Sequence, residues 1–215
     1  VPYRETVKGK AEVQGRYKKQ TGGRGQFGDC WIRLAPRARG EGYEFVDAIV
    51  GGVIPRQYIP AVDKGIQEAS ARGVVAGYPV VDFQVELFDG SFHNVDSSEM
   101  AFKVAGSLAF KKACEKAGIA LLEPIMQMHI AVPEEFMGDI IGDLSSRRGK
   151  VLGYESNQGI TEITAQVPMS EILRYAPDLR SMTGGQGTFT MEFDHYEECP
   201  PQVAEKVIAE SRDEE

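Results

Sequence analysis

Three glycines in the stretch QTGGRGQFG have a spacing that binds dinucleotides in some folds, so nucleotide chemistry is the first possibility to test. Gly23, Gly25 and Gly28 match the pattern G-x-G-x-x-G. This pattern holds a pyrophosphate only where a strand precedes the glycines and a helix begins within them. The residues that follow, FGDCWIRLAP, instead alternate with a period of two, which predicts a strand. We therefore expect a hairpin with a glycine-rich loop and no dinucleotide site.

Other residues that could do chemistry form no recognisable catalytic or metal-binding set. Neither Gly-Lys pair, at Lys10 and Lys150, is followed by the Ser or Thr that a phosphate-binding P-loop requires. His129 and His195 lie in predicted strands, whereas His93 lies in a polar loop, where side chains more often serve function. The three cysteines are far apart and show no CxxC spacing, which indicates buried thiols. We expect no catalysis, no cofactor and no metal site in this chain.

The charge distribution predicts a nucleic-acid contact in spite of a net charge of −8. The acidic excess is concentrated from Glu192 to Glu215, where nine acidic and two basic residues occur. From Lys8 to Arg24 the chain has six basic residues and one acidic residue, Glu12, and this segment leads into the glycine loop. Glycines let backbone amides and cationic side chains approach a crowded polyanion, and a thin hairpin tip could enter the wide minor groove of double-stranded RNA. Two structural alternatives are a solvated strand whose lysines prevent edge aggregation and a mobile surface loop.

Length and composition are those of a soluble protein with one or two domains. The chain has 215 residues, of which 42% are hydrophobic and 26% charged. No apolar run reaches the roughly 20 residues needed to span a membrane, and no signal peptide is recognised. We therefore expect a cytoplasmic protein that does not bind membranes.

The periodicity of the chain predicts an α+β fold with two domains that meet near Glu123 and Pro124. In the first half, the residue pattern predicts the hairpin, strands at 43–50 and 78–88, a helix from about residue 59 to Gly73, and a turn at 89–90. A longer helix follows, with Asp96 expected as its N-cap and Gly118 at its end. Its expected inner face is Ala101, Val104, Ala105, Leu108 and Ala109. The second half predicts the order βαββαβ of a ferredoxin-like domain, with MSEILRYA as its second helix, and a last helix over 200–211.

Several long stretches resemble bacterial-type elongation factor G, the ribosomal translocase, specifically its fourth and fifth domains. They are YRETV, GGRGQFG, GYEFVDAIVGGVIPRQYIPAVDKGIQEA, GYPVVDFQVELFDGSFHNVDSSEMAFKVAGSLAFK, LLEPIM, GDIIGDLSSRRG and LRSMTGGQGTFTMEFDHY. Together they cover nearly the whole chain. The resemblance implies a ribosomal-protein-like βα domain with a long hairpin tip over residues 1–122, and a ferredoxin-like domain over 123–199. It also implies that the helix over 200–215 packs back on the first domain.

The resemblance further implies a mechanical role in GTP-dependent translocation. In the family, the fourth domain enters the decoding site of the small ribosomal subunit beside the tRNA–mRNA duplex, and the fifth lies near the GTPase-associated rRNA of the large subunit. GTP and Mg²⁺ belong to an N-terminal domain of the family that is not in this sequence, so this chain is expected to be a monomer without enzyme activity. The implied tip residues are Lys18, Lys19, Gln20, Thr21, Gly22, Gly23, Arg24 and Gly25 in one loop, and Phe92, His93, Asn94, Val95, Asp96 and Ser97 in the other. Gln20 and His93 occupy the positions that touch the codon–anticodon duplex.

Some residues depart from the family pattern. Phe27 and Phe92 replace a more common tyrosine, Asn94 replaces an acidic residue, and Gln186 replaces an arginine in a loop of the fifth domain. Losing that arginine removes a charge-assisted phosphate contact. The expected rRNA-binding residues of this domain are therefore Arg147, Arg148 and Lys150. A paralogue specialised for ribosome recycling and a ribosomal protection protein are the alternatives, and a free-standing enzyme on these domains would lack a site.

Overall fold

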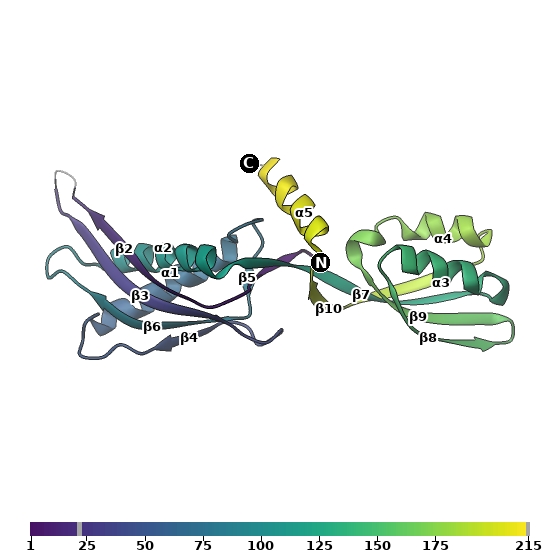
Figure 1. Ribbon diagram of the computed structural model, residues 1–215, viewed down its shortest axis with the longest axis horizontal. Helices are drawn as coiled ribbons and strands as arrows, with labels where there is room; N and C mark the ends of the chain where they lie inside the picture. The colour runs from purple at the N-terminus through teal and green to yellow at the C-terminus, as the bar shows by residue number, and fades with distance from the viewer. Residues whose placement is uncertain (21–22, 214–215) are drawn as a thin grey trace. The chain divides into compact units, whose positions relative to one another are not determined.

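The computed structural model describes residues 1–20 and 23–213, which form two compact units. The larger unit contains Arg4–Leu122 and Cys199–Glu215, and the smaller contains Val1–Tyr3 and Glu123–Glu198. Each unit combines helices with a β-sheet (Figure 1). The expected α+β class is confirmed.

A four-stranded sheet with two helices on one face forms most of the larger unit (Figure 1). Its strands are β2 (Ala11–Lys19), β3 (Gln26–Pro36), β6 (Phe83–Ser91) and β4 (Glu44–Asp47), in that spatial order. Strands β2 and β3 pair antiparallel from Ala11↔Leu34 to Lys19↔Gln26, which confirms the long hairpin. Its helices are α1 (Ile59–Arg72), preceded by a 3-10 turn at Arg56–Tyr58, and α2 (Glu99–Ala117).

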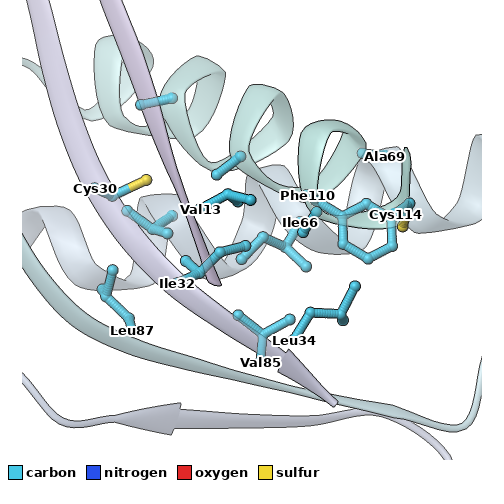
Figure 2. Packing of buried hydrophobic residues seen from close by; sticks show 14 of the residues in the cluster. Val13, Cys30, Ile32, Leu34, Ile66, Ala69, Val85, Leu87, Phe110 and Cys114 are labelled. Atoms are coloured by element: carbon cyan, nitrogen blue, oxygen red, sulfur yellow. The ribbon is translucent and has the colours of Figure 1, made fainter. Parts of the chain in front are cut away.

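The core of the larger unit lies between this sheet and the two helices, as Figure 2 shows. Strand alternation puts Cys30, Ile32 and Leu34 of β3 inward, where all three are at most 1% exposed. Helix α2 presents Phe102 and Phe110 to this core, together with small residues such as Ala105. Leu108, which we expected on the inner face, is 41% exposed. The buried face of α2 is centred on Phe102 and Phe110, and Leu108 lies outside it. Burial of two aromatic rings outweighs burial of one leucine.

Two glycines of the hairpin allow α2 to pack directly on the backbone of β2 and β3. A Cβ on Gly15 would lie 2.3 Å from the carbonyl oxygen of Ala105, and one on Gly28 would lie 2.5 Å from that of Ala101. The third glycine of the opening pattern therefore serves helix packing. Because α2 contacts the hairpin at both positions, the hairpin is supported along its length up to the tip.

Two short strands fix the start of the larger unit. Strand β1 (Arg4–Val7) pairs parallel with β5 (Val80–Val81) and antiparallel with the first residues of β7 (Ile119–Pro133). The carboxylate of Glu5 is fully buried and accepts hydrogen bonds of 2.7 to 3.0 Å from four backbone amides. These amides belong to Val74, Val75, Ala76 and Tyr78. The buried charge is thus satisfied by hydrogen bonds to backbone donors.

One predicted strand is divided, and one predicted turn is absent. The stretch 78–88 is split between β5 and β6 by Asp82, whose φ is 58°. The expected turn at Asp89 and Gly90 lies within β6, which continues to Ser91. Gly90 pairs with Cys30, and a Cβ at this position would lie 2.4 Å from the carbonyl oxygen of Asp29. The glycine therefore allows a close contact between strands in place of a turn.

The smaller unit has the predicted order βαββαβ. The remainder of β7 pairs with β9 (Ile160–Pro168) and β10 (Thr188–Glu198), and β9 pairs with β8 (Lys150–Asn157). Its helices are α3 (Met137–Ser146) and α4 (Tyr175–Thr183), with 3-10 turns at Glu134–Phe136 and Met169–Glu171. The helix expected at MSEILRYA is wrong in position, because only a 3-10 turn forms there and α4 begins at Tyr175. The last helix, α5 (Pro201–Asp213), is grouped with the larger unit and buries Val207.

Candidate nucleic-acid interface

The two loops implicated by the sequence meet at one end of the larger unit. One connects β2 to β3, and the other connects β6 to α2. The amide of Phe27 donates a 2.9 Å hydrogen bond to the carbonyl oxygen of Asp96, and Phe27 and Ser97 form a parallel β-bridge. Thr21 and Gly22 lie outside the described residues. The segments on either side of the hairpin turn and the second loop thus form one tip.

The hydroxyl of Ser97 is the centre of this tip. Ser97 is 8% exposed, and its hydroxyl accepts a 2.8 Å hydrogen bond from the His93 amide. It donates in turn to the carbonyl oxygen of Phe27 at 3.0 Å. The Ser97 amide donates back to the carbonyl oxygen of His93 at 3.1 Å, and the hydroxyl of Tyr58 in the 3-10 turn donates to the carbonyl oxygen of Ser97. One buried side chain therefore connects both loops to each other and closes the turn that carries His93.

The imidazole of His93 is held in one tautomer. Its Nδ1 accepts the backbone N–H groups of Val95 and Asp96 at 3.3 and 3.2 Å. Because an imidazole nitrogen that accepts hydrogen bonds carries no proton, the neutral ring has its proton on Nε2. The His93 side chain is 55% exposed. The neutral imidazole thus presents one N–H donor, at Nε2, suited to a phosphate, a 2′-hydroxyl or a base acceptor.

The two loops carry further cationic and polar groups. The guanidinium of Arg24 donates to the carbonyl oxygen of Val95 at 3.2 Å, which connects the hairpin loop to the second loop. Gly25 packs against the Asp96 carboxylate, since a Cβ there would lie 2.9 Å from a carboxylate oxygen. The other described tip residues are exposed: Lys18, Lys19, Gln20, Gly23, Phe92, Asn94 and Val95. The site has the exposure, charge and hydrogen-bonding groups of a surface that binds a nucleic-acid backbone.

The N-cap of α2 differs from the sequence expectation. Ser98, and not Asp96, precedes the helix, and its hydroxyl accepts the Ala101 amide at 3.1 Å. Either residue type can cap a helix. The capping role of Ser98 leaves Asp96 within the loop, where its backbone connects to Phe27 and its carboxylate lies 3.6 Å from Nδ1 of His93.

The two arginines proposed for rRNA binding in the smaller unit are engaged with carboxylates of the same unit. Arg147 donates to Asp143 at 2.8 Å and to Asp178 at 2.7 Å. Arg148, with φ of 59°, makes a two-pronged contact with Glu123 at 2.7 and 3.1 Å. The hydrogen bonds to Glu123 raise the pKa of Arg148 above its usual value and outweigh the effect of partial burial. These contacts stabilise the unit, and neither arginine is left as a free cation for phosphate.

Two further residues of this domain are exposed. Lys150 begins β8, and Gln186 lies in the turn between α4 and β10. The engagement of Arg147 and Arg148 could not be seen in the sequence, because Glu123 and Asp178 are 25 and 31 positions away from their respective partners.

Titratable groups elsewhere in the described part of the chain give no catalytic arrangement. His195 on β10 contacts Asp194 and Glu197. Partial burial lowers the pKa of His195, but the hydrogen bonds to these carboxylates outweigh it and raise the pKa above the usual value. Over residues 1–20 and 23–213, no cluster of His, Cys, Asp and Glu has the arrangement of a metal site. The helices of the same residues are too short or too polar to cross a bilayer.

Comparison with known proteins gives matches along nearly the whole chain. A family model described as elongation factor G, domain IV, matches residues 1–118, and one described as elongation factor G C-terminus matches residues 120–207. A crystal structure of a protein from Thermus thermophilus is similar, with a TM-score of 0.87 and 48% sequence identity. That match covers 100% of this chain and 32% of the other, so the chain spans about a third of its length.

Proposed function

The chain belongs to the elongation factor G family, and from this premise we propose that it is the RNA-contacting part of a translocase that moves tRNA and mRNA on the ribosome. The family models that match are those of domain IV and of the C-terminus. The proposed partners are the decoding site of the small subunit with its tRNA–mRNA duplex, and the GTPase-associated rRNA of the large subunit. The cytoplasm, where translation takes place, is the proposed location.

The observation that supports this proposal most directly is the joining of the two loops through Ser97. Loops that moved independently would lose conformational entropy on each encounter with RNA. The hydrogen bonds of Ser97 to His93 and Phe27 join the second loop to the start of β3 before any ligand arrives. A tip joined in this way would present the Nε2 donor of His93 and the exposed Gln20 side chain at the same end of the domain.

The proposed mechanism is mechanical. The hairpin, supported by α2 across Gly15 and Gly28, would enter beside the codon–anticodon duplex as a rigid wedge. Its exposed lysines and Arg24 would bind phosphates, while polar tip groups would bind 2′-hydroxyls and base edges. A wedge that occupies the vacated space would prevent the duplex from slipping back. The chain itself would need no catalytic group, cofactor or metal, and GTP hydrolysis would belong to another domain of the intact factor.

For the smaller unit, the proposed contact with rRNA rests on Lys150. Arg147 and Arg148 are assigned to the internal ion pairs instead. The exposed ammonium of Lys150 is compact and flexible, and it would contribute a salt-dependent attraction to phosphate. Gln186 can supply only neutral hydrogen bonds at the turn where the family more often has arginine.

The decisive test replaces both Gln20 and His93 with alanine in the full-length factor. We expect slower single-round translocation, while ribosome-stimulated GTP hydrolysis stays close to the unaltered rate. Lys64→Ala serves as the control, because Lys64 is exposed on α1 outside both loops. Unchanged translocation in the double variant would refute the tip assignment. The same proteins should be assayed for ribosome recycling, since a defect confined to recycling would favour the paralogue specialised for that step.

A further inference from the structure

The face of the four-stranded sheet that lies opposite the helices carries aromatic rings beside guanidinium groups. Residues 16, 27, 31 and 33 point to this face, because their neighbours on β2 and β3 point into the core. The guanidinium carbon of Arg16 lies 5.3 Å from the ring centre of Phe27, and the ring centre of Trp31 lies 6.4 Å from that of Phe88. The guanidinium carbon of Arg33 lies 3.7 Å from the ring centre of Phe88. Rings arranged this way offer flat surfaces on which an unpaired base can stack.

A hollow of about 530 Å³ lies beside Trp31 at the outer edge of β2. Strand β2 is the end strand of its sheet, next to α2 in Figure 1. From α2, Lys112 and Lys116 reach over this edge, and their ammonium nitrogens lie 3.4 Å from the carbonyl oxygens of Gln14 and Glu12. Lysines at a strand edge oppose pairing with another strand. The edge is therefore protected against an added peptide strand, while its ammonium groups remain exposed.

The charge around this hollow differs from that of the chain as a whole. The chain has a net charge of −8. Around the hollow and along the adjacent part of β2, the exposed basic residues are Arg16, Lys18, Lys112 and Lys116, and the acidic ones are Glu12 and Glu115. Asp29 shares the face but is 7% exposed, and its two oxygens accept hydrogen bonds from Gln14 and Ser91. A local basic excess beside a partly exposed indole fits a nucleic-acid strand.

We propose that this surface, formed by Gln14, Arg16, Trp31, Lys112 and Lys116 and called here the edge surface, binds a short segment of single-stranded RNA. One base stacks on the indole of Trp31, and the flanking phosphates bind the ammonium groups at the edge of β2 and the guanidinium of Arg16. Inside a duplex both faces of a base are covered by its stacked neighbours, so single strands are favoured over duplexes. The edge surface is distinct from the tip, and the proposal does not depend on what the tip binds.

Trp31 is the only tryptophan of the chain, so its fluorescence reports on the proposed contact directly. An unstructured ten-nucleotide RNA is titrated into the 215-residue chain at low salt, in parallel with a duplex of the same sequence and with inorganic polyphosphate. We expect saturable quenching by the single strand, little quenching by the duplex or polyphosphate, and weaker binding as salt is raised. No quenching by the single strand, or equal quenching by all three, would overturn the proposal.

Single substitutions distinguish the contribution of base stacking to RNA affinity from that of charge. Trp31→Ala should weaken binding of a fluorescently labelled RNA by about 5- to 150-fold, and Trp31→Phe should retain most of the affinity. Arg16→Ala retains Trp31 as the fluorescent reporter and should weaken RNA binding several-fold, whereas the control Lys64→Ala should not weaken it. Circular dichroism melting confirms that each variant is folded. Equal RNA affinity of folded Trp31→Ala and the unaltered chain would refute the stacking contact.

A last pair of variants distinguishes the edge surface from the tip. Gln20→Ala and His93→Ala should leave the quenching of Trp31 by single-stranded RNA unchanged. Loss of quenching in these variants would place the binding site at the tip and overturn the assignment to the edge surface. Their effect on translocation tests the proposed function separately, so the two proposals can fail independently.

Discussion

Replacing Ser97 with alanine should loosen the tip without unfolding the larger unit. The change removes the hydrogen bond that the Ser97 hydroxyl accepts from the His93 amide and the one that it donates to the carbonyl oxygen of Phe27. Both partners lose a bond in a site where the serine is 8% exposed. The hydrophobic core between the sheet and the helices does not include Ser97 and should remain intact.

The size of the effect follows from these two bonds. Each contributes on the order of 1 kcal/mol, so the two together stabilise the closed tip by about 2 kcal/mol. Since about 1.4 kcal/mol corresponds to a factor of ten, local opening of the tip should become roughly 30-fold more frequent. The global free energy of unfolding should change less, because opening the tip does not expose the core.

Native-state hydrogen exchange measured by NMR gives the required readout. The amides of Phe27 and Ser97 should exchange about 30-fold faster in Ser97→Ala, whereas the amide of Cys30, within the paired part of the hairpin, should be unaffected. Ser181→Ala provides a matched control, because Ser181 is exposed on α4 of the other unit. If the Phe27 amide kept its protection in a folded Ser97→Ala protein, the idea that this hydroxyl joins the loops would be refuted.

Four further predictions concern packing and titration. Gly28→Ala should lower the free energy of unfolding in urea by about 1–3 kcal/mol, because its Cβ would overlap the backbone of α2. Gly142→Ala, in a helical position with open space, should raise that energy by about 0.5–1 kcal/mol, and a loss would contradict the packing argument. The pKa of His195 should exceed 6.5 in an NMR titration, because two adjacent carboxylates favour its charged form. The contribution of charged His195 to the free energy of unfolding should therefore be complete below about pH 6.5 and disappear as pH rises through the folded-state pKa. His195→Gln should abolish this pH dependence. Burial raises the pKa of Cys30 and of Cys114 to about 12, so neither thiol should react with iodoacetamide at pH 8 until the chain unfolds, and rapid native labelling would count against this burial.

Local sequence patterns predicted the elements well where one face of each element was buried. The alternation around Trp31 predicted β3, and the periodicity from about residue 59 to Gly73 predicted α1. Patterns were less successful where a long-range contact decided the outcome. Leu108 has the right spacing for the inner face of α2, but Phe102 and Phe110 occupy the space against the sheet.

The candidate site was predicted as two loops, and the contact between them was not. Nothing local in the sequence indicates that the Ser97 hydroxyl contacts Phe27, which is 70 positions away. In the same way, Arg147 and Arg148 were expected to bind rRNA, and no sequence pattern indicated that distant carboxylates bind both of them. The N-cap was predicted at the wrong residue for a different reason, because Asp96 and Ser98 are both good capping residues and only the three-dimensional course of the loop selects one.

The carboxylate of Glu5 sets a practical limit on how this protein can be shortened. Four amides between Val74 and Tyr78 depend on it, and β1 supplies it from a position far from them in sequence. A truncation or proteolytic cut that removed β1 would leave these donors buried without an acceptor, although the hairpin and both helices would be complete. The first strand is therefore an integral part of the tip-bearing domain, and an excised version that starts at the hairpin should be prone to aggregation.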